Sequence, residues 1–579
     1  MLRYLNIFFG FLAILIGFSC ATPGRPTGGL KDETPPVPTH FLPKNFSTDF
    51  NARTITVKFD ENIQLRNLNQ QLVVSPPMAR PQISSNNRTL TIRLQDTLRS
   101  NSTYVFSFGD AVVDLNEGNV LPNFQYVFST GKTIDSLSVV GEVLDAFTLQ
   151  PVKNVSMTLL ENLDSLSSRS ARPMYIAKAD ADGFFRFDFL HDGCFYLAAI
   201  NDQNNDWTYD SLQEDLAFLY ACVSPIYIEK SMCAAGCCAI EDSSHVHDST
   251  EYIVKELHQL LMFKQELPQG INKSEFVSNA AISVEFRNPT ENAKFQILQP
   301  DTMPPSYHIR WNNDVQKAEF FLSKTGIRNL WLSVEDGDFL DTLKLLNTMF
   351  QDTLVPPKVV LTSGQELPYF DTLKLSFSVP IREIKDTFWL FTGNDTIAQP
   401  LTDFSFNESR TQLVFHTDLN QRTNYRLLIR DSLFFDYFDQ TNQDTLTFNF
   451  RKNSPESYAK LEITILNKPD ESCILQVLNE RMDVIEQRTM ESDKEIFSTL
   501  KPGKYRLRLI VDENRNGRWN PGNLRERRQP EPVFIFPKIL TLSADWEYDE
   551  EWDLLEKSTS SVAPETPVKQ DNIQHQRQR

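Results

Sequence analysis

Two stretches of the chain, residues 193–209 and 503–519, align with each other without a gap. Each begins with glycine, continues as an alternating apolar and polar run, and ends in a loop rich in Asp and Asn. Six matched pairs carry the alignment: Gly193 with Gly503, Phe195 with Tyr505, Leu197 with Leu507, Asp202 with Asp512, Asn204 with Asn514 and Tyr209 with Trp519. Self-similarity across a long separation is the signature of a duplicated structural unit. The sequence therefore predicts a chain built from duplicated β modules.

The composition indicates how many such modules there are and of which class. At 579 residues the chain has room for about four or five domains, and 40% of its residues are apolar. Phe is the dominant aromatic residue, with 42 copies, and 32 prolines punctuate the chain. This mixture is typical of short strands joined by turns, and we predict an all-β chain of tandem β-sandwich domains. The formal net charge of -19 argues against a nucleic-acid partner.

The N-terminus has the features of an export signal. Arg3 is followed by an apolar run over residues 4–18, which is too short for a comfortable membrane span. The run ends in Gly17-Phe-Ser-Cys20. A small residue before a cysteine at this place resembles a bacterial lipobox, which implies cleavage after residue 19 and lipidation of Cys20. The alternative is an ordinary secretory signal in which Cys20 is incidental. Residues 20–34 are predicted to form a flexible tether.

The start of the mature chain also resembles a known family. Cys20-Ala21, the Pro- and Gly-rich tether, Lys31-Asp32 and Pro35-Pro36 look like Bacteroidota envelope lipoproteins with bacterial Ig-like (SbsA-type) domains. The resemblance is clear over residues 20–210 and returns at the C-terminal repeat. It implies a lipid-anchored protein of the outer membrane, facing the periplasm or the cell surface, and it implies fold and location more than activity.

Residues 35–131 and 355–452 show the same succession of alternating strands, which predicts two Ig-like sandwiches. In the first, the expected strands lie at residues 54–59, 89–94 and 103–108; in the second, they lie at residues 372–377, 411–415 and 424–429. A repeat module follows each sandwich, at residues 136–218 and 458–546. The order of strands in these modules resembles the prealbumin-like, carboxypeptidase-regulatory-like fold, which implies a small seven-strand sandwich and no peptidase residues.

Two parts of the chain lie outside this scheme. Residues 219–350 are predicted to form a central β-rich region that also carries a cysteine cluster and a short helix, since apolar residues between 251 and 265 recur at helical spacing. The tail, residues 547–579, is rich in Ser, Thr, Pro and Gln from about Glu556 and is predicted to be disordered.

The loops that end the two aligned stretches are candidate calcium sites. Calcium takes six to eight oxygen ligands, and side chains with oxygen atoms recur here at alternating positions. The candidate ligands are Asp202, Asn204, Asp206 and Asp210 in the first loop, and Asp512, Asn514 and Asn516 in the second. Neither set is complete, because Trp207 stands where such a loop uses glycine and Asn523 stands where it uses Glu. The alternative is a polar loop held by Asx turns.

Four cysteines are candidates for disulfide bonds, since an even number of cysteines in an exported chain usually forms a disulfide framework. They are Cys222, Cys233, Cys237 and Cys238, and Cys194 and Cys473 complete a set of six once Cys20 is set aside. A zinc site that includes His245 and His247 is one alternative, and unpaired thiols are another. The connectivity does not follow from the sequence.

The sequence contains none of the common catalytic motifs, such as Gly-x-Ser-x-Gly, His-Glu-x-x-His or a Walker A loop. We therefore expect no enzymatic activity and no certain cofactor. The function predicted is a scaffold or interaction module, anchored in the membrane by lipid, with glycans or other envelope proteins as partners. Two alternatives stay open: a carbohydrate-binding or adhesin-type surface lipoprotein, suggested by Trp207 and Trp519, and a hydrolase with its site in residues 219–350.

Overall fold

The computed structural model describes residues 32–167, 172–204, 206–210, 214–227, 257–290, 292–300, 304–349 and 353–555. Within these residues the chain forms strands almost throughout. The only α-helix in this part is the single turn α2 (Leu68–Gln71), and two short 3-10 turns, η1 (Leu163–Ser167) and η2 (Pro455–Ser457), complete the helical structure. The prediction of an all-β chain of tandem sandwiches is confirmed. In the described part, no helix is long and apolar enough to cross a membrane.

The first sandwich packs two sheets around an aromatic core. Its strands are β1 (Pro38–Leu42), β2 (Thr54–Phe59), β6 (Thr89–Arg93) and β5 (Gln82–Asn86) in one sheet; β4 (Val73–Ser75), β7 (Thr103–Ser107) and β9 (Gln125–Ser129) in the other; and the pair β3 (Ile63–Leu65) and β8 (Val112–Asp114). Strand β2 shows why these residues form a sandwich. Ile55, Val57 and Phe59 alternate with more exposed Thr and Lys residues, so one face of the strand is buried.

The second Ig-like sandwich repeats this plan. One sheet has the order β24 (Val359–Leu361), β26 (Lys374–Phe377), β31 (Gln412–Phe415) and β30 (Phe404–Phe406); the other has β25 (Glu366–Leu367), β34 (Leu446–Lys452), β32 (Asn424–Ile429), β28 (Phe388–Thr392) and β29 (Gln399–Leu401); and β27 (Ile381–Ile384) pairs with β33 (Phe434–Asp436). The order β24-β26-β31-β30 matches β1-β2-β6-β5, and the pair β27-β33 matches β3-β8. The strands predicted at residues 54–59 and 424–429 have the predicted bounds.

Both copies of the repeat module have seven corresponding strands in two sheets. The first repeat, which we define as residues 136–263, contains β13 (Phe184–Leu190), β10 (Leu137–Asp145) and β16 (His258–Met262) in one sheet, and β12 (Tyr175–Lys178), β11 (Ser156–Leu160), β14 (Tyr196–Ile200) and β15 (Leu216–Phe218) in the other. The second repeat, residues 458–555, contains β38 (Lys494–Leu500), β35 (Ala459–Leu466) and β42 (Glu547–Asp553), and β37 (Val484–Met490), β36 (Ser472–Leu478), β39 (Gly503–Asp512) and β40 (Val533–Ile535), with β41 (Leu540–Leu542) added beside β39.

The last strand of each repeat corrects the sequence analysis. Strand β16 pairs in parallel with β10, and β42 pairs in parallel with β35, so both complete a repeat sandwich. The boundary at residue 218 therefore cut the first repeat short, and the boundary at 546 assigned a strand to the tail. The helix predicted within residues 251–265 is wrong for 258–262, which form a strand. The apolar spacing there predicted a helix, whereas residues 260 and 262 face the core as alternate residues of a strand.

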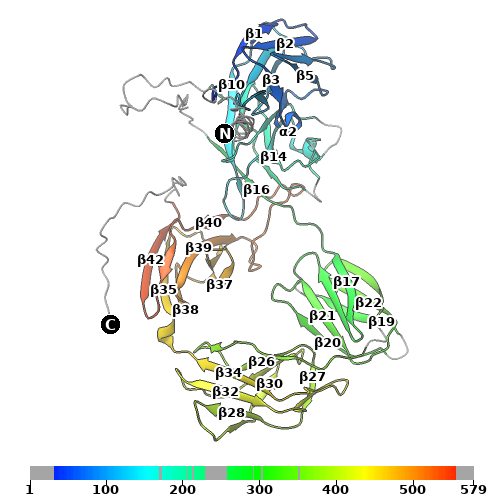
Figure 1. Cartoon of the computed structure of the whole chain (residues 1–579), viewed down its shortest axis with the longest axis vertical. Helices are drawn as coiled ribbons and strands as arrows, with labels where there is room; N and C mark the ends of the chain where they lie inside the picture. Colours follow the sequence, from blue (N-terminus) through cyan, green and yellow to red (C-terminus); the bar gives the residue numbers. More distant parts are fainter. Residues whose placement is uncertain are drawn as a thin grey trace, which may run out of the picture.

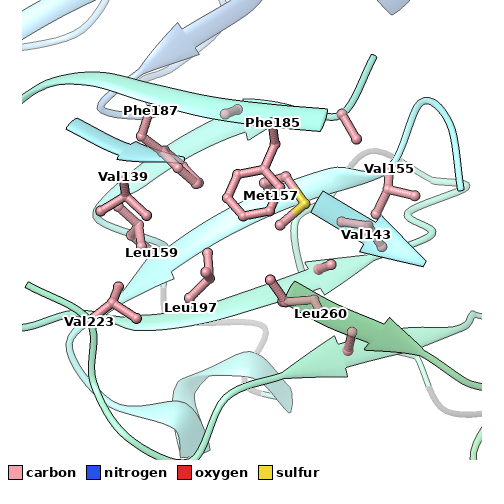
Figure 2. Close-up of a cluster of buried hydrophobic side chains, with 14 of the residues drawn as sticks. Val139, Val143, Val155, Met157, Leu159, Phe185, Phe187, Leu197, Val223 and Leu260 are labelled. Carbon is pink, nitrogen blue, oxygen red and sulfur yellow. The ribbon is translucent and has the colours of Figure 1, made fainter. Parts of the chain in front are cut away.

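Figure 2 shows the core that this last strand completes. Leu260 from β16 points into the same cluster as Met157 and Leu197 from the facing sheet, and Met157 lies beside the ring of Phe185. All four side chains are almost completely buried. Burying a large apolar side chain contributes about 1.5–3 kcal/mol, so a repeat that lacked its last strand would lose a substantial part of its core.

The central region forms a third kind of sandwich between the first repeat and the second Ig-like domain. Its sheets are β17 (Ile271–Ser278), β18 (Ala281–Phe286), β21 (Lys317–Leu322) and β20 (Tyr307–Trp311), and β19 (Lys294–Gln299), β22 (Asn329–Asp336) and β23 (Phe339–Leu346). The chain passes through this sandwich and through the second Ig-like domain before the second repeat returns to the first (Figure 1). The two repeats therefore lie next to each other, although their aligned stretches are far apart in sequence.

A tyrosine holds the same turn in both Ig-like sandwiches, and each can be tested by mutation. The backbone N–H of Arg99 donates to the Tyr104 hydroxyl at 2.8 Å, and the N–H of Asn420 donates to the Tyr425 hydroxyl at 2.8 Å. We expect Tyr104→Phe and Tyr425→Phe each to lower the free energy of unfolding by about 1 kcal/mol, measured by urea denaturation. Tyr458→Phe is the control, because the buried Tyr458 hydroxyl has no hydrogen-bond partner among the described residues. An equal loss in the control would refute the role of the turn.

Candidate functional site

The Asx-rich loop of the second repeat folds around Asp512, the last residue of β39. Its carboxylate accepts hydrogen bonds from the backbone N–H groups of Asn516 at 3.0 Å and Gly517 at 2.9 Å. Gly517 has a φ of 77°, a left-handed conformation that glycine adopts without steric cost. The Asn514 side chain also accepts from the Asn516 N–H, at 3.1 Å. The loop is thus closed on its own backbone by acidic and amide side chains.

The loop of the first repeat has the same geometry at the matched positions. The Asp202 carboxylate accepts from the N–H groups of Asp206 at 3.2 Å and Trp207 at 3.1 Å. Trp207, the counterpart of Gly517, has a φ of 62°. A residue with a Cβ pays roughly 1–2 kcal/mol for this conformation, so the first loop keeps its shape despite an unfavourable residue. The gapless alignment of the two stretches therefore reflects a shared structure.

A buried glutamate braces each loop, and the sequence analysis missed both. Glu531 accepts from the N–H groups of Glu513 at 3.0 Å and Asn520 at 2.8 Å. Glu214 accepts in the same way from Gln203 at 3.1 Å and Asp210 at 3.0 Å. Since Gln203 matches Glu513 and Asp210 matches Asn520 in the alignment, the two glutamates are structural equivalents.

Burial raises the pKa of both glutamates above the ordinary value for this residue, although the backbone N–H bonds oppose the shift. The glutamates were missed because they follow the matched loop positions at different distances in the sequence. Glu214 comes four positions after Asp210, whereas Glu531 comes eleven positions after Asn520. A gapless alignment cannot pair them.

The predicted calcium ligands accept hydrogen bonds within their own loops. Both oxygens of Asp202 and both oxygens of Asp512 accept N–H groups of their own loops. Among the described residues, no group of three or more His, Cys, Asp or Glu side chains is placed to hold a metal ion. Calcium also takes amide and backbone oxygens, which such a group does not include. Binding of calcium stays a prediction.

One predicted disulfide residue is paired in the structure. Cys222 bonds to Cys194, with 5.4 Å between their Cα atoms, and this bond ties the start of β14 to the segment after β15. Cys473 is a free, buried thiol whose pKa is raised by burial. The other candidates, Cys233, Cys237 and Cys238, lie outside the described residues, as do Cys20 and both histidines of the alternative zinc site.

The strands that lead into the two Asx loops are buried on both faces. In β14, Leu197 and Ala199 belong to the core of the first repeat, whereas Ala198 and Ile200 belong to a second cluster outside it. In β39, residues 507–512 are buried without interruption. A sheet that faces solvent on one side shows alternating burial, and continuous burial means that the outer face is covered.

The two repeats cover these outer faces for each other. Phe147, in the loop after β10 of the first repeat, packs on Ile474 and Ile510 of the second repeat. Its ring lies 4.9 Å from the Trp519 ring and 3.7 Å from the Arg508 guanidinium carbon. Trp519 also packs against the outer cluster of the first repeat. The two duplicated units thus form one continuous apolar contact.

Arg508 is the charged member of this contact. It is 3% exposed, and burial lowers its pKa to about 10. Its Nε donates to the side-chain oxygen of Gln476 at 2.8 Å. At the matched position, the first repeat has Ala198, which is also buried in the contact. The second repeat therefore supplies the guanidinium, while the first supplies the Phe147 ring that covers it.

Residues 32–130 match a known family, the bacterial Ig-like domain. No curated protein matches the chain. Solved structures similar to it include the Bacillus anthracis TIE protein, at 12% identity over 91% of this chain and 75% of that chain with a TM-score of 0.12, and the S-layer protein rSbsC(31-844), at 8% identity over 81% and 63% with a TM-score of 0.12. The chicken CNTN1 FN1-FN3 domains are 9% identical over 46% of this chain and 96% of that chain, with a TM-score of 0.14. Residues 32–130 thus form an Ig-like domain similar to the bacterial family.

The buried Glu531 side chain predicts a specific pH dependence of the free energy of unfolding. Because the pKa of Glu531 is raised in the folded state, the folded chain binds more protons between the ordinary and the raised pKa, and the free energy of unfolding falls as pH rises through that window. We expect Glu531→Gln to reduce this dependence and to cost about 1–3 kcal/mol, since an amide can accept only one of the two N–H groups. Urea denaturation across acidic to neutral pH measures both effects. Glu526→Gln, on an exposed side chain of the same repeat, is the control, and an equal change there would refute the prediction.

Calcium binding can be tested by thermal unfolding in millimolar CaCl₂ and in EDTA. If the loops bind calcium, as the sequence predicts, we expect a higher Tm in CaCl₂, whereas equal Tm values would favour loops that are closed only by their own Asx turns. A ligand that binds only the folded state raises stability, so a higher Tm in CaCl₂ would show binding. If Asp202→Asn or Asp512→Asn abolished such a rise, the affected loop would be the calcium site.

Proposed function

We propose that the chain is a lipid-anchored protein of the cell envelope that acts as a non-enzymatic scaffold or interaction module. The observation that carries this proposal is the packing of the two repeats, which holds the β-sandwiches of one chain in a defined arrangement. A protein that serves as a scaffold needs such fixed geometry between its domains, because flexibly joined domains present no constant surface to a partner. Ig-like domains of the bacterial type are consistent with this role.

The buried carboxylates support a structural role as well. Asp114 accepts from the N–H groups of Glu117 at 2.6 Å and Asn119 at 2.6 Å, and Asp436, at the end of the corresponding strand β33, accepts from Phe438 at 2.8 Å. Together with Glu214 and Glu531, these side chains fix the shape of loops. Buried carboxylates at catalytic centres instead face a pocket with a reacting group. These acids therefore support a structural role for the sandwiches that contain them, whereas the hydrolase alternative concerns residues 219–350.

The carbohydrate-binding alternative rests on two tryptophans, Trp207 and Trp519, beside polar loops. The structure places them differently. Trp519 packs in the contact between the repeats, and its ring nitrogen donates a hydrogen bond to the Glu531 carbonyl at 3.0 Å. Trp207 lies at a partly buried position of the first loop, so one aromatic residue is left to support this function. Stacking on sugars by Trp519 would require the repeats to separate.

Anchoring and orientation can be tested together in intact cells. We expect an alkyne fatty acid to label the protein, and Cys20→Ala to abolish the label while export persists. Protease treatment of the same cells then shows the side of the membrane: cleavage places the protein on the cell surface, where glycan binding becomes the experiment to pursue, and protection places it in the periplasm. Labelling that survives in Cys20→Ala, or its absence in the unmodified chain, would refute the anchor.

A further inference from the structure

The second repeat carries an insertion that the first repeat lacks. Counted between the matched loop position and the bracing glutamate, the separation is four positions in the first repeat, from Asp210 to Glu214, and eleven in the second, from Asn520 to Glu531. The second repeat thus has seven additional residues at this place. We call residues 521–530 the clasp segment. Since Glu531 still braces its loop, the insertion leaves the local architecture of the repeat intact.

The clasp segment makes hydrogen bonds across the contact to the first repeat. The Leu524 N–H donates to the side-chain oxygen of Gln265 at 3.2 Å, just beyond β16. The Gln529 N–H donates to the Tyr220 hydroxyl at 2.8 Å, and the Gln529 side-chain amide donates to the Phe218 carbonyl at 2.8 Å. The bond to the Phe218 carbonyl falls at the edge strand β15, where a backbone group is available for an added chain segment, and Tyr220 follows two residues later.

Apolar and charged contacts complete the attachment. Leu524 packs into the outer cluster of the first repeat, which includes Phe263. Gly522 lies so close to this ring that a Cβ at this position would be 2.4 Å from its Cζ, so only glycine permits the approach. The Arg527 guanidinium donates to the Asp164 carboxylate at 3.1 Å and 3.3 Å.

The clasp segment is also closed at its base. Asn523 and Arg528 exchange backbone hydrogen bonds of 2.7 Å and 2.8 Å, and the Arg528 guanidinium donates to the Pro521 carbonyl at 2.9 Å. The Glu531 N–H donates to the Asn520 carbonyl at 3.1 Å. A segment held in this way by its own bonds loses little conformational entropy when it docks, which favours a stable attachment.

From these contacts we propose that the clasp segment is a docking element whose partner is the first repeat of the same chain, and that it closes the chain upon itself. The closure fixes the central sandwich and the second Ig-like domain, which lie between the two repeats in the sequence (Figure 1). Because both repeats belong to one chain, the contact forms at a high effective concentration and needs no large interface. Release of the clasp segment removes Leu524 from the outer cluster of the first repeat and frees the Phe218 carbonyl of β15. This inference is independent of the lipid anchor.

A chimera within the chain itself tests the proposal. Residues 521–530 are replaced by Ser-Leu-Gln, the sequence at residues 211–213 that joins the matched positions in the first repeat. We expect the second repeat to stay folded, the radius of gyration from small-angle X-ray scattering to rise, and amide exchange at residues 214–220 to quicken by about tenfold or more. An unchanged radius together with unchanged exchange would overturn the clasp.

A pair of point variants covers the case in which the chimera fails to fold. Leu524→Asp puts a charge into the outer cluster of the first repeat, whereas Arg525→Asp puts the same side chain at an exposed neighbouring position. We expect faster exchange at residues 214–220 in Leu524→Asp and none of this effect in Arg525→Asp. Equal exchange in both variants would overturn the proposal. Small-angle scattering also gives the molecular mass. If the unmodified protein had the mass of two chains and Leu524→Asp had the mass of one, the clasp segment would bind a neighbouring copy, and the proposal would be overturned.

Discussion

The arrangement of the molecule depends on the burial of one sheet face in each repeat against the other repeat. A β-sandwich needs one buried face per sheet, and the remaining face can stay in water. Strands β14 and β39 are buried on both faces, and residues of the other repeat contribute to the cover of each outer face. Phe147, Arg508 and Trp519 join the two faces. Because the repeats are separated by two other sandwiches in the sequence, this one contact determines the course of the whole chain.

Duplication explains why the two faces suit each other, and divergence explains why they differ. The repeats share strand order, parallel closing strands, Asx-rich loops and bracing glutamates. At the contact they are no longer alike: the second repeat has Arg508 where the first has Ala198, and only the second has the clasp segment. Two identical faces would place like groups opposite each other. The Arg508 guanidinium of the second repeat instead lies against the Phe147 ring of the first, so unlike groups meet at the contact.

The acidic side chains of the described residues show how a chain of high negative charge can use carboxylates for structure. In the repeats, two aspartates close the loops and two glutamates hold them from outside: Asp202, Asp512, Glu214 and Glu531. In the first sandwich, Asp114 accepts backbone N–H groups of its loop in the same way. Each accepts backbone N–H groups of the loop that it holds. Loops built in this way are stiff, which suits a protein that presents surfaces rather than one that moves during a reaction.

The sequence by itself determined the β class, the duplication and most strands, because alternating residues and matched turns are local signals. The strands at residues 54–59 and 424–429 have the predicted bounds, and the two loops have the shared geometry that the alignment implied. Only the tertiary structure decided that β16 belongs to the first repeat, that the two glutamates are equivalent, and that Trp519 packs between the repeats. Each of these depends on a partner distant in the sequence, and a local pattern carries no information about what lies opposite it in space.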